Sequence, residues 1–302
     1  MGMLKEILLR AGAEHWATGH FNASEADHMR AIVSACRELG APAIIGTSEG
    51  ERTHLGLFEA VALRDALRRE FGIPVFLNAD HSKSVAVAKQ AIDAGYDSIH
   101  IDLSAESFEK NVAGTKEIVE YAKEKFTAVA GHSNILQNLG MSVEGELGYL
   151  RGESKIQNEK IAVSADDYTK PEQAREFVAS TDVDRLAIVV GNIHGISRDE
   201  PDLDIARIRE IRAAVPEHVA LVLHAGSGIP DGQIREAIAA GIANIHINTD
   251  LRVAYAAELR KTLAEDMDQT AMYKLDVAAM EVMKEVVKQK LTLFGAVGKI
   301  ER

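Results

Sequence analysis

Short apolar runs rich in β-branched residues alternate along the whole chain with longer segments in which apolar residues recur every three or four positions. The short runs predict strands and the longer segments predict amphipathic helices. The predicted strands are Thr18–Asn22, Ala43–Ser48, Val75–Asp80, Ser98–Asp102, Ser142–Gly148, Leu186–Asn192, Val219–His224 and Ala243–Asn248. The predicted helices between them are Glu25–Leu39, Leu57–Phe71, Val85–Ala94, Phe108–Lys125, Pro171–Ser180, Ile205–Val215 and Asp231–Ala240. This regular alternation is typical of parallel α/β structure.

Eight strand–helix units favour a closed (β/α)8 TIM barrel over an open sheet. The length of 302 residues suits one such barrel, and no Pro-rich, Gly/Ser-rich or low-complexity linker divides the chain. We therefore predict a single barrel domain over residues 1–302. Beyond the last strand, the stretch Ala256–Lys290 is predicted to form extra C-terminal helices. An apolar stripe on it should pack on the barrel or at a subunit interface, and it contains Leu275, Ala279, Val282 and Val286.

Two segments interrupt the regular alternation. Phe126–Gly140 connects the fourth helix to the fifth strand. Such connections lie on the face of a barrel opposite the active site, so this segment is expected to serve stability or assembly. Tyr149–Asp167 follows the fifth strand and is long and polar. A loop of this kind on the catalytic face is predicted to be a mobile lid.

The charge balance restricts the partners of the chain. Lys and Arg number 34 against 46 Asp and Glu, which gives a formal charge of −12. A chain this acidic repels phosphate backbones, so nucleic acid is not an expected partner. Cys36 is the single cysteine, which excludes an intramolecular disulfide and suits a reducing compartment. No apolar run is long enough for a membrane span or signal peptide, so a cytoplasmic protein is expected.

Three histidines directly follow or close predicted strands, namely His81, His194 and His224. In a barrel the carboxyl ends of the strands open onto one rim, where catalytic groups gather. One histidine at such a position means little, but three could meet around one ion. Three neutral imidazoles with an open fourth position form a catalytic zinc site, whereas structural zinc usually has four Cys or His ligands.

Two other strand ends suggest an anion site. His224-Ala225-Gly226-Ser227-Gly228 and Asn248-Thr249-Asp250 each lead from a strand into a helix. Glycines allow backbone N–H groups to approach a ligand closely, and helix N-termini favour anions. Barrel enzymes often bind phosphate at the loops after strands seven and eight, which is where these segments lie.

With these motifs the chain resembles the class II, metal-dependent fructose-bisphosphate aldolase family, which includes tagatose-bisphosphate aldolases. The resemblance spans nearly the whole length. The matching segments are Trp16–Asn22, Ser48-Glu49-Gly50, Asp80-His81, Val143-Glu144-Gly145-Glu146-Leu147-Gly148, Tyr168-Thr169-Lys170-Pro171, His194-Gly195, Leu223–Pro230, Thr249-Asp250-Leu251-Arg252 and Leu293-Phe294-Gly295.

The resemblance implies a set of catalytic and metal-binding residues. Zn²⁺ or another divalent ion would be held by His81, His194 and His224, with Asp80 as the acid/base group beside it. Glu146 is a candidate ligand for a displaced or second ion, and a monovalent cation is also compatible with the family. Glu144 and Asp102 match carboxylates near the metal, and Glu153 in the predicted lid is the candidate loop acid.

The resemblance also implies a substrate site for a phosphorylated ketose. One phosphate would be held by Gly195, Gly226, Ser227, Asn248 and Thr249. Arg252 matches an arginine that reaches the other phosphate, in the family often across the interface of a homodimer or homotetramer. Arg198 falls where many relatives carry a lysine. Asn22 and Ser48, in matching motifs, are counted with the substrate-binding residues.

Three positions depart from the family pattern. His246 replaces an asparagine that contacts the enediolate, Asn248 replaces an aspartate of many relatives, and Ala225 replaces a glycine. None of these changes removes an implied metal ligand, so they bear on substrate preference. His246 could donate the same hydrogen bond through an imidazole N–H, which makes it a catalytic candidate, or could contact the metal.

The expected reaction is retro-aldol cleavage, most simply of fructose 1,6-bisphosphate to dihydroxyacetone phosphate and glyceraldehyde 3-phosphate. A divalent cation would stabilise the negative charge on the ketone half. Asp80 and His81 can share one site only if the strand turns at its end, because neighbouring strand residues point to opposite faces. A Schiff-base mechanism needs a buried lysine, and none lies in the eight predicted strands.

Other functions remain open at the level of sequence. A different ketose phosphate, such as tagatose bisphosphate, could be the substrate. A metal-dependent hydrolase on the same fold would share the histidines, although it has less need of two phosphate-type loops. An inactive sugar-phosphate-binding relative could have arisen through the changes at His246 and Asn248.

Overall fold

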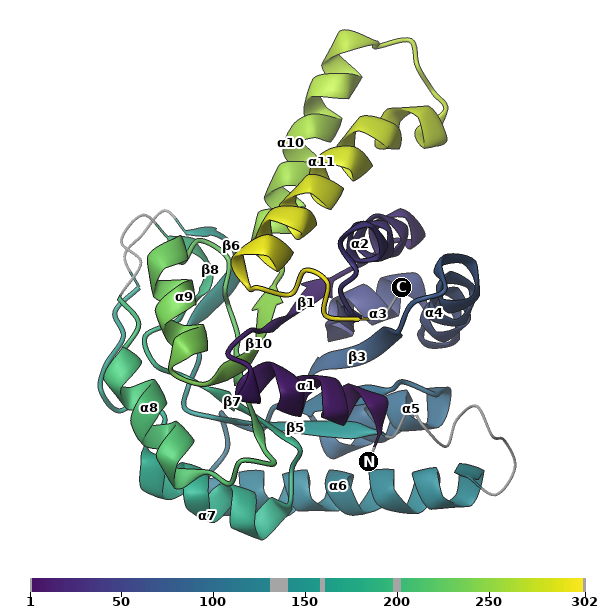
Figure 1. Cartoon of the computed structure of the whole chain (residues 1–302). Helices are drawn as coiled ribbons and strands as arrows, with labels where there is room; N and C mark the ends of the chain where they lie inside the picture. Colours follow the sequence, from purple (N-terminus) through teal and green to yellow (C-terminus); the bar gives the residue numbers. More distant parts are fainter. Residues whose placement is uncertain (1, 131–140, 158–160, 198–201, 301–302) are drawn as a thin grey trace.

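Eight parallel strands close into a barrel in the order β1-β10-β9-β7-β5-β4-β3-β2 (Figure 1). The computed structural model describes residues 2–130, 141–157, 161–197 and 202–300. The barrel strands are β1 (Thr18–Asn22), β2 (Ala43–Thr47), β3 (Val75–Ser82), β4 (Ser98–Ile101), β5 (Ser142–Leu147), β7 (Arg185–Ile188), β9 (Ala220–Leu223) and β10 (Ile242–Ile247). The predicted TIM barrel is therefore confirmed.

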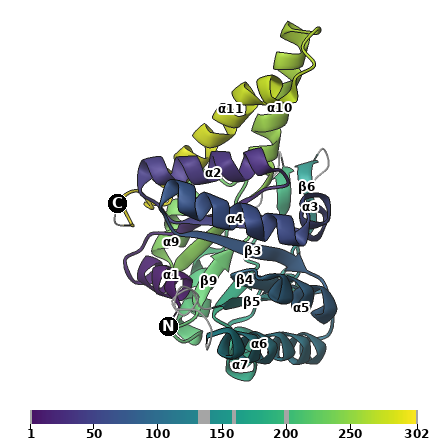
Figure 2. The same ribbon diagram turned by 90° about the vertical axis from the view of Figure 1, so that its right-hand side faces the viewer.

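Helices surround the barrel because each predicted amphipathic segment turns its apolar face toward the strands (Figures 1 and 2). The seven predicted helices are present as α2 (Ala26–Leu39), α4 (Leu57–Phe71), α5 (Val85–Ala94), α6 (Phe108–Ala130), α7 (Pro171–Thr181), α8 (Ile205–Ala214) and α9 (Asp231–Ala239). Helix α6 extends beyond the predicted end at Lys125. The remainder of the predicted connection, residues 131–140, lies outside the described residues.

Two helices were not predicted from the pattern. Helix α1 (Met3–Ala13) buries Leu4, Leu8 and Ala11, and it packs against β9 and β10. Helix α3 (Glu49–Leu55) begins at Ser48, whose side chain accepts a hydrogen bond from the Glu51 N–H, while the Glu51 carboxylate accepts one from the Ser48 N–H. This capping box starts a helix directly at the end of β2.

The strand predicted over Leu186–Asn192 is shorter than expected and ends at Ile188. The chain then turns at residues 189–193 and enters β8 (His194–Ser197), which pairs in parallel with β6 (Gly152–Gln157). This two-stranded sheet lies outside the barrel. Part of the segment predicted as a mobile lid is therefore a strand, and residues 158–160 within it lie outside the described residues.

The predicted extra C-terminal helices are present as α10 (Thr249–Glu265) and α11 (Met272–Leu293). They form a hairpin that projects from the barrel (Figure 1). The buried positions of α11 are Leu275, Ala279, Met283, Val287 and Leu291. The predicted stripe is therefore correct in its first turn and displaced by one residue beyond Ala279. Among the described residues, no helix is both long and apolar enough to span a bilayer.

Candidate active site

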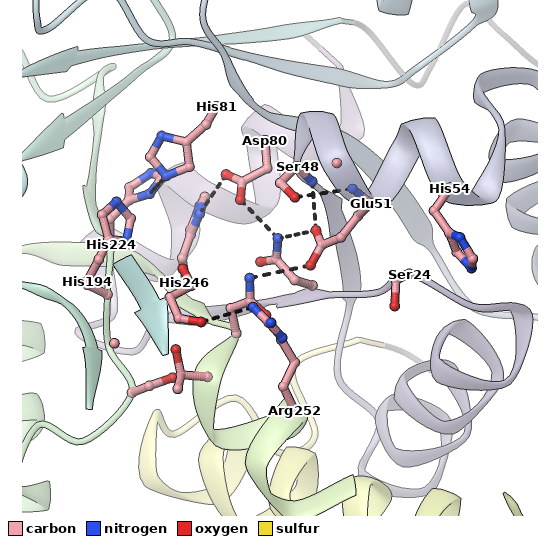
Figure 3. Close-up of a pocket in the computed structure, with 18 of the residues that line it drawn as sticks. Ser24, Ser48, Glu51, His54, Asp80, His81, His194, His224, His246 and Arg252 are labelled. Carbon is pink, nitrogen blue, oxygen red and sulfur yellow. Dashed lines mark hydrogen bonds and ion pairs between the residues drawn. The ribbon is translucent and has the colours of Figure 1, made fainter. Parts of the chain in front are cut away.

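A pocket of about 510 Å³ opens at the carboxyl ends of the barrel strands (Figure 3). Most of the predicted site residues line it. They come from the ends of β1, β2, β3, β9 and β10 and from the start of β8. The lining residues are Asn22, Ser24, Glu25, Ser48, Gly50, Glu51, His54, Asp80, His81, Ser154, His194, Gly195, His224, Ala225, Ser227, His246, Asn248, Thr249 and Arg252.

The end of β3 is irregular. Asp80 and His81 are neighbours in the chain, and they can face the same pocket only if the strand turns at its end. His81 has a left-handed backbone with φ of 45°, and the register with β4 shifts between Ala79 and Ser82. Asp80 and His81 consequently both face the pocket. A non-glycine residue in this conformation is uncommon and usually marks a functional position.

The imidazole rings of His81 and His224 lie side by side, and a carboxylate fixes the tautomer of each. His81 Nδ1 lies 2.7 Å from an Asp102 oxygen, and His224 Nε2 lies 2.7 Å from a Glu144 oxygen. Burial opposes ionisation of both carboxyls. The hydrogen bond from His81 and the Lys83 ammonium nevertheless keep the pKa of Asp102 well below its usual value. The Arg185 guanidinium does the same for the pKa of Glu144. The carboxylates accept, so those ring nitrogens donate.

The other nitrogens of the two rings, His81 Nε2 and His224 Nδ1, lie 3.2 Å apart. If both rings are neutral, each of these two nitrogens carries a lone pair and no proton, so they cannot hydrogen bond to each other. Tetrahedral coordination with bonds of about 2.1 Å places ligands roughly 3.4 Å apart. The pair therefore fits a shared divalent cation, with the carboxylates orienting both rings.

The third predicted imidazole, His194, packs against His81. It does not belong to the described cluster around this pair whose ligand atoms all lie within 4.8 Å of one another, which consists of Asp80, His81, His100 and His224. The ring centroid of His194 lies 5.1 Å from that of His81, and the His81 and His224 centroids are 4.8 Å apart. Burial, with the adjacent His81 and His224, lowers the pKa of His194 to about 3. It is consequently neutral at neutral pH, as a metal-bound imidazole must be.

His100 joins this cluster, although the sequence analysis gave it no role. Its Nδ1 accepts a hydrogen bond from the His81 backbone N–H at 3.2 Å, and its Nε2 lies 3.1 Å from Glu146. Because Nδ1 accepts this hydrogen bond, it carries no proton, and the N–H of the His100 ring is at Nε2, facing the Glu146 carboxylate. His100 thus connects Glu146 to the turn that carries His81. The sequence does contain an indication of this role: His100 lies two residues before Asp102 on the same predicted strand, so both side chains are expected on the same face.

Glu144 is held by a second buried partner. Arg185 Nη1 lies 2.7 Å from Glu144, and neither side chain is exposed to solvent. The Arg185 guanidinium also donates to Asn78 of β3 and Ser98 of β4, across the inside of the barrel from β7. A charged network through the barrel interior therefore fixes the carboxylate that orients His224.

Asp80 is buried yet ionised. Burial opposes ionisation, but the adjacent His81 keeps the pKa of Asp80 well below its usual value. One carboxylate oxygen accepts a hydrogen bond from Asn22 Nδ2 at 3.0 Å, and Asn22 also donates to Glu51 at 2.8 Å. The other oxygen has no hydrogen-bond partner among the described residues. A carboxylate with one free oxygen facing a pocket is suited to act as a base.

His246 lies between the imidazole cluster and Asp80 (Figure 3). Its ring centroid is 3.9 Å from that of His224, and its Nδ1 is 3.4 Å from Asp80 Oδ1. The opposite face of the ring stacks on His20 with a centroid separation of 3.5 Å. His20 is a fully buried histidine of β1 to which the sequence analysis assigned no function.

Two of the five predicted phosphate residues lie at the start of α10. Asn248 and Thr249 line the pocket at this helix N-terminus, together with Gly195 and Ser227. Gly226 does not line it, because its N–H donates to the His246 carbonyl at 2.9 Å. A Cβ on Gly226 would lie 2.6 Å from Ile245, so this glycine permits close packing.

Arg252, in the first turn of α10, lines the pocket and donates to the Ser154 carbonyl at 3.0 Å. Glu153, the predicted loop acid, is not brought into the pocket. Its side chain is 73% exposed and pairs with Lys155 at 2.6 Å. Successive strand residues face opposite sides, so Ser154 of β6 faces the pocket and Glu153 faces away. Arg198 lies outside the described residues.

The chain is similar to known proteins over nearly its whole length. The family described as "Fructose-bisphosphate aldolase class-II" matches residues 3–299. A fructose-bisphosphate aldolase of Staphylococcus aureus (strain Mu50) is 36% identical over 295 residues, which are 97% of this chain and 96% of that protein. A Staphylococcus epidermidis (strain ATCC 12228) protein of the same name is 35% identical over the same shares. The crystal structure of the YdjI aldolase from Escherichia coli K12 superposes with a TM-score of 0.80 at 31% identity, covering 99% of both chains.

Proposed function

The chain belongs to the class II fructose-bisphosphate aldolase family, a family of lyases, and we propose that it reversibly cleaves fructose 1,6-bisphosphate in a zinc-dependent reaction. The products would be dihydroxyacetone phosphate and glyceraldehyde 3-phosphate. Tagatose bisphosphate or another ketose phosphate is the alternative substrate. Family membership favours an aldolase over a metal-dependent hydrolase on the same barrel.

One observation carries the zinc dependence: two imidazole nitrogens, His81 Nε2 and His224 Nδ1, face each other at 3.2 Å while their opposite nitrogens are bound to carboxylates. We assign the metal to these two rings and His194, with Glu146 as a further candidate ligand. When bound, the divalent ion would supply a positive charge that stabilises the ketone half as the carbon–carbon bond breaks. Asp102 and Glu144 would orient the rings.

Asp80 supplies the base. In cleavage its free oxygen takes the proton of the C4 hydroxyl, the C4–O bond becomes the aldehyde carbonyl, and the electrons of the C3–C4 bond pass to the ketone half. In condensation Asp80 returns the same proton. Asn22 holds the second carboxylate oxygen at 3.0 Å and so fixes the direction of the free one. A positioned acid/base group of this kind contributes roughly 10²- to 10⁴-fold in rate.

The ketone half must also gain a proton at C3 before release. Glu153 remains our candidate for this step, and to act it has to move from its exposed position on β6 toward the pocket. The move requires breaking the exposed ion pair with Lys155. This costs little free energy, because an exposed ion pair contributes little to stability.

The substrate phosphates would bind on the side of the pocket formed by α10. Thr249 and Asn248 stand at the N-terminus of this helix, where the backbone dipole favours an anion. Ser227 and Gly195 complete one subsite, and Arg252 supplies the charge for the other. Ser48 would contact the substrate near Asn22. We further propose a homodimer or homotetramer in the cytoplasm, as the family implies.

A coupled assay tests the function. The zinc-loaded protein is given fructose 1,6-bisphosphate, and triose phosphate release is followed through a dehydrogenase, with and without a chelator. Cleavage that the chelator abolishes and added zinc restores would support the proposal. Cleavage that survives the chelator and is trapped by borohydride would instead indicate a Schiff base, even though none of the barrel strands contains a lysine.

Two substitutions separate the assigned roles. His224→Ala should lose bound zinc and turnover together, because it removes a ligand. Asp80→Ala should keep zinc, measured by elemental analysis, and lose turnover. Unchanged turnover in Asp80→Ala would show that another group is the base.

A further inference from the structure

A chain of hydrogen bonds through Thr18 and Asn244 determines which ring nitrogen of His246 carries the proton. The Asn244 amide nitrogen lies 3.2 Å from the Thr18 carbonyl oxygen and 2.9 Å from the Thr18 hydroxyl. That hydroxyl in turn donates to the Ala243 carbonyl at 3.2 Å. Carbonyl oxygens only accept, so the Asn244 amide cannot be turned round. Its Oδ1 therefore faces His246.

His246 Nε2 lies 3.1 Å from this Asn244 oxygen and must carry the proton. A neutral imidazole has one N–H, so His246 Nδ1 is a bare acceptor. His246 Nδ1 makes no hydrogen bond to any described residue, as expected of a nitrogen without a proton. The donor role that the family asparagine suggested is thus unavailable, because the N–H is already engaged.

The bare nitrogen faces the pocket beside the base. His246 Nδ1 and Asp80 Oδ1 are 3.4 Å apart, both residues are 4% exposed, and neither atom has a hydrogen-bond partner among the described residues. Two buried acceptors without donors are unfavourable unless a ligand supplies the hydrogens. A ligand with hydroxyl groups on adjacent carbons would supply one to each acceptor.

We propose that His246 Nδ1 accepts a hydrogen bond from the α-hydroxyl of the aldehyde half of the substrate, next to the hydroxyl held by Asp80, and so selects α-hydroxyaldehydes. This inference rests on the proposed aldol reaction. The oxygen on the reacting aldehyde carbon faces Asp80, and the metal site is suited to the oxygens of the ketone half. The remaining neighbouring hydroxyl is the one on the aldehyde side. Asn244 acts as a positioning residue that holds the acceptor tautomer.

Aldehyde selectivity gives the kinetic test. The zinc enzyme condenses dihydroxyacetone phosphate with glycolaldehyde or with acetaldehyde, which lacks the α-hydroxyl, and the ratio of the two kcat/KM values is measured. We expect His246→Leu to lower this ratio about 10- to 100-fold, the range for one buried hydrogen bond. The matched control is His218→Leu, at an exposed histidine that does not line this pocket, which should keep the ratio. An unchanged ratio in His246→Leu overturns the inference.

The tautomer gives a test that does not need turnover. Nitrogen-15 spectra of ¹⁵N-histidine-labelled zinc enzyme, assigned by comparison with His246→Asn, should show His246 protonated at Nε2 and bare at Nδ1. In Asn244→Leu the ring loses its acceptor, so both tautomers should appear and the aldehyde ratio should fall. Protonated Nδ1 in the wild type refutes the assignment. Failure to condense either aldehyde, with the expected tautomer present, would instead refute the proposed aldolase function.

Discussion

The carboxylate behind His81 offers a direct test of how the metal ligands are oriented. Asp102 is 4% exposed, and its carboxylate lies 2.7 Å from His81 Nδ1. The substitution Asp102→Asn keeps a similar shape and an amide oxygen that can accept the same hydrogen bond. It removes the negative charge that makes the imidazole a stronger ligand and favours the tautomer with Nε2 free.

The expected loss follows from this single contact. Carboxylates that support a metal-bound histidine typically contribute 10- to 100-fold in metal affinity, or about 1.4 to 2.7 kcal/mol. The Lys83 ammonium, which also pairs with Asp102, would lose its partner in the variant and add a nearby uncompensated charge. We therefore expect an effect toward the upper end of this range.

Zinc affinity is measured by competition with a chromogenic chelator, on apoprotein prepared by dialysis. Asp102→Asn should weaken zinc binding at least tenfold, while Asp182→Asn, at a side chain that is 72% exposed, should not alter it. Equal affinities in Asp102→Asn and the wild type would show that the Asp102–His81 contact does not orient a ligand. The metal site would then have to be assigned without His81.

Three further predictions concern stability. Ala225→Gly should raise the free energy of unfolding by about 1 kcal/mol in thermal melts, since Ala225 has a φ of 56°, where an L-residue is strained; a lower melting temperature would mean that the residue is not strained. Arg185→Met should lower stability by about 3 to 5 kcal/mol in urea titrations of the apoprotein, because it leaves Glu144 buried without its cation; a neutral effect would contradict the ion pair. Burial lowers the pKa of His20 to about 4. As the pH falls from 6.5, the unfolded chain therefore gains a proton before the folded one does. The free energy of unfolding should fall by up to about 3 kcal/mol by pH 4. His20→Gln should show a shallower decline in apoprotein melts over that pH range, and an equal decline would assign the effect to other groups.

The barrel was accessible from the sequence because its signals are local. Each strand is an apolar run that needs only its own residues to be recognised, and β1, for example, has the predicted bounds Thr18–Asn22. Helix α1 was missed because it contacts β9 and β10, more than 200 residues away, and that contact defines its apolar face. The turn that shortens β7 was missed because β8 is defined by its partner β6.

The site was predictable where a residue acts from a strand end, as for His81, His194 and His224. It was not predictable where a role depends on a partner from another strand. Arg185 is significant because it meets Glu144, and Asn244 because it meets His246. The position of Glu153 could not be derived either, since the alternation of side chains along β6 is known only once that segment is seen to be a strand.

One buried cation explains how the chain maintains the turn on which the site depends. Arg52, on the short helix α3, donates to the Thr47 carbonyl at 2.5 Å, to the Asp80 carbonyl at 2.9 Å and to the Ser82 hydroxyl at 3.0 Å. These contacts tie the end of β2 to both sides of the left-handed residue His81. A strained backbone persists only where its surroundings fix it. The base and the metal ligand therefore share one pocket because a capped helix from the preceding strand end holds the β3 turn in place.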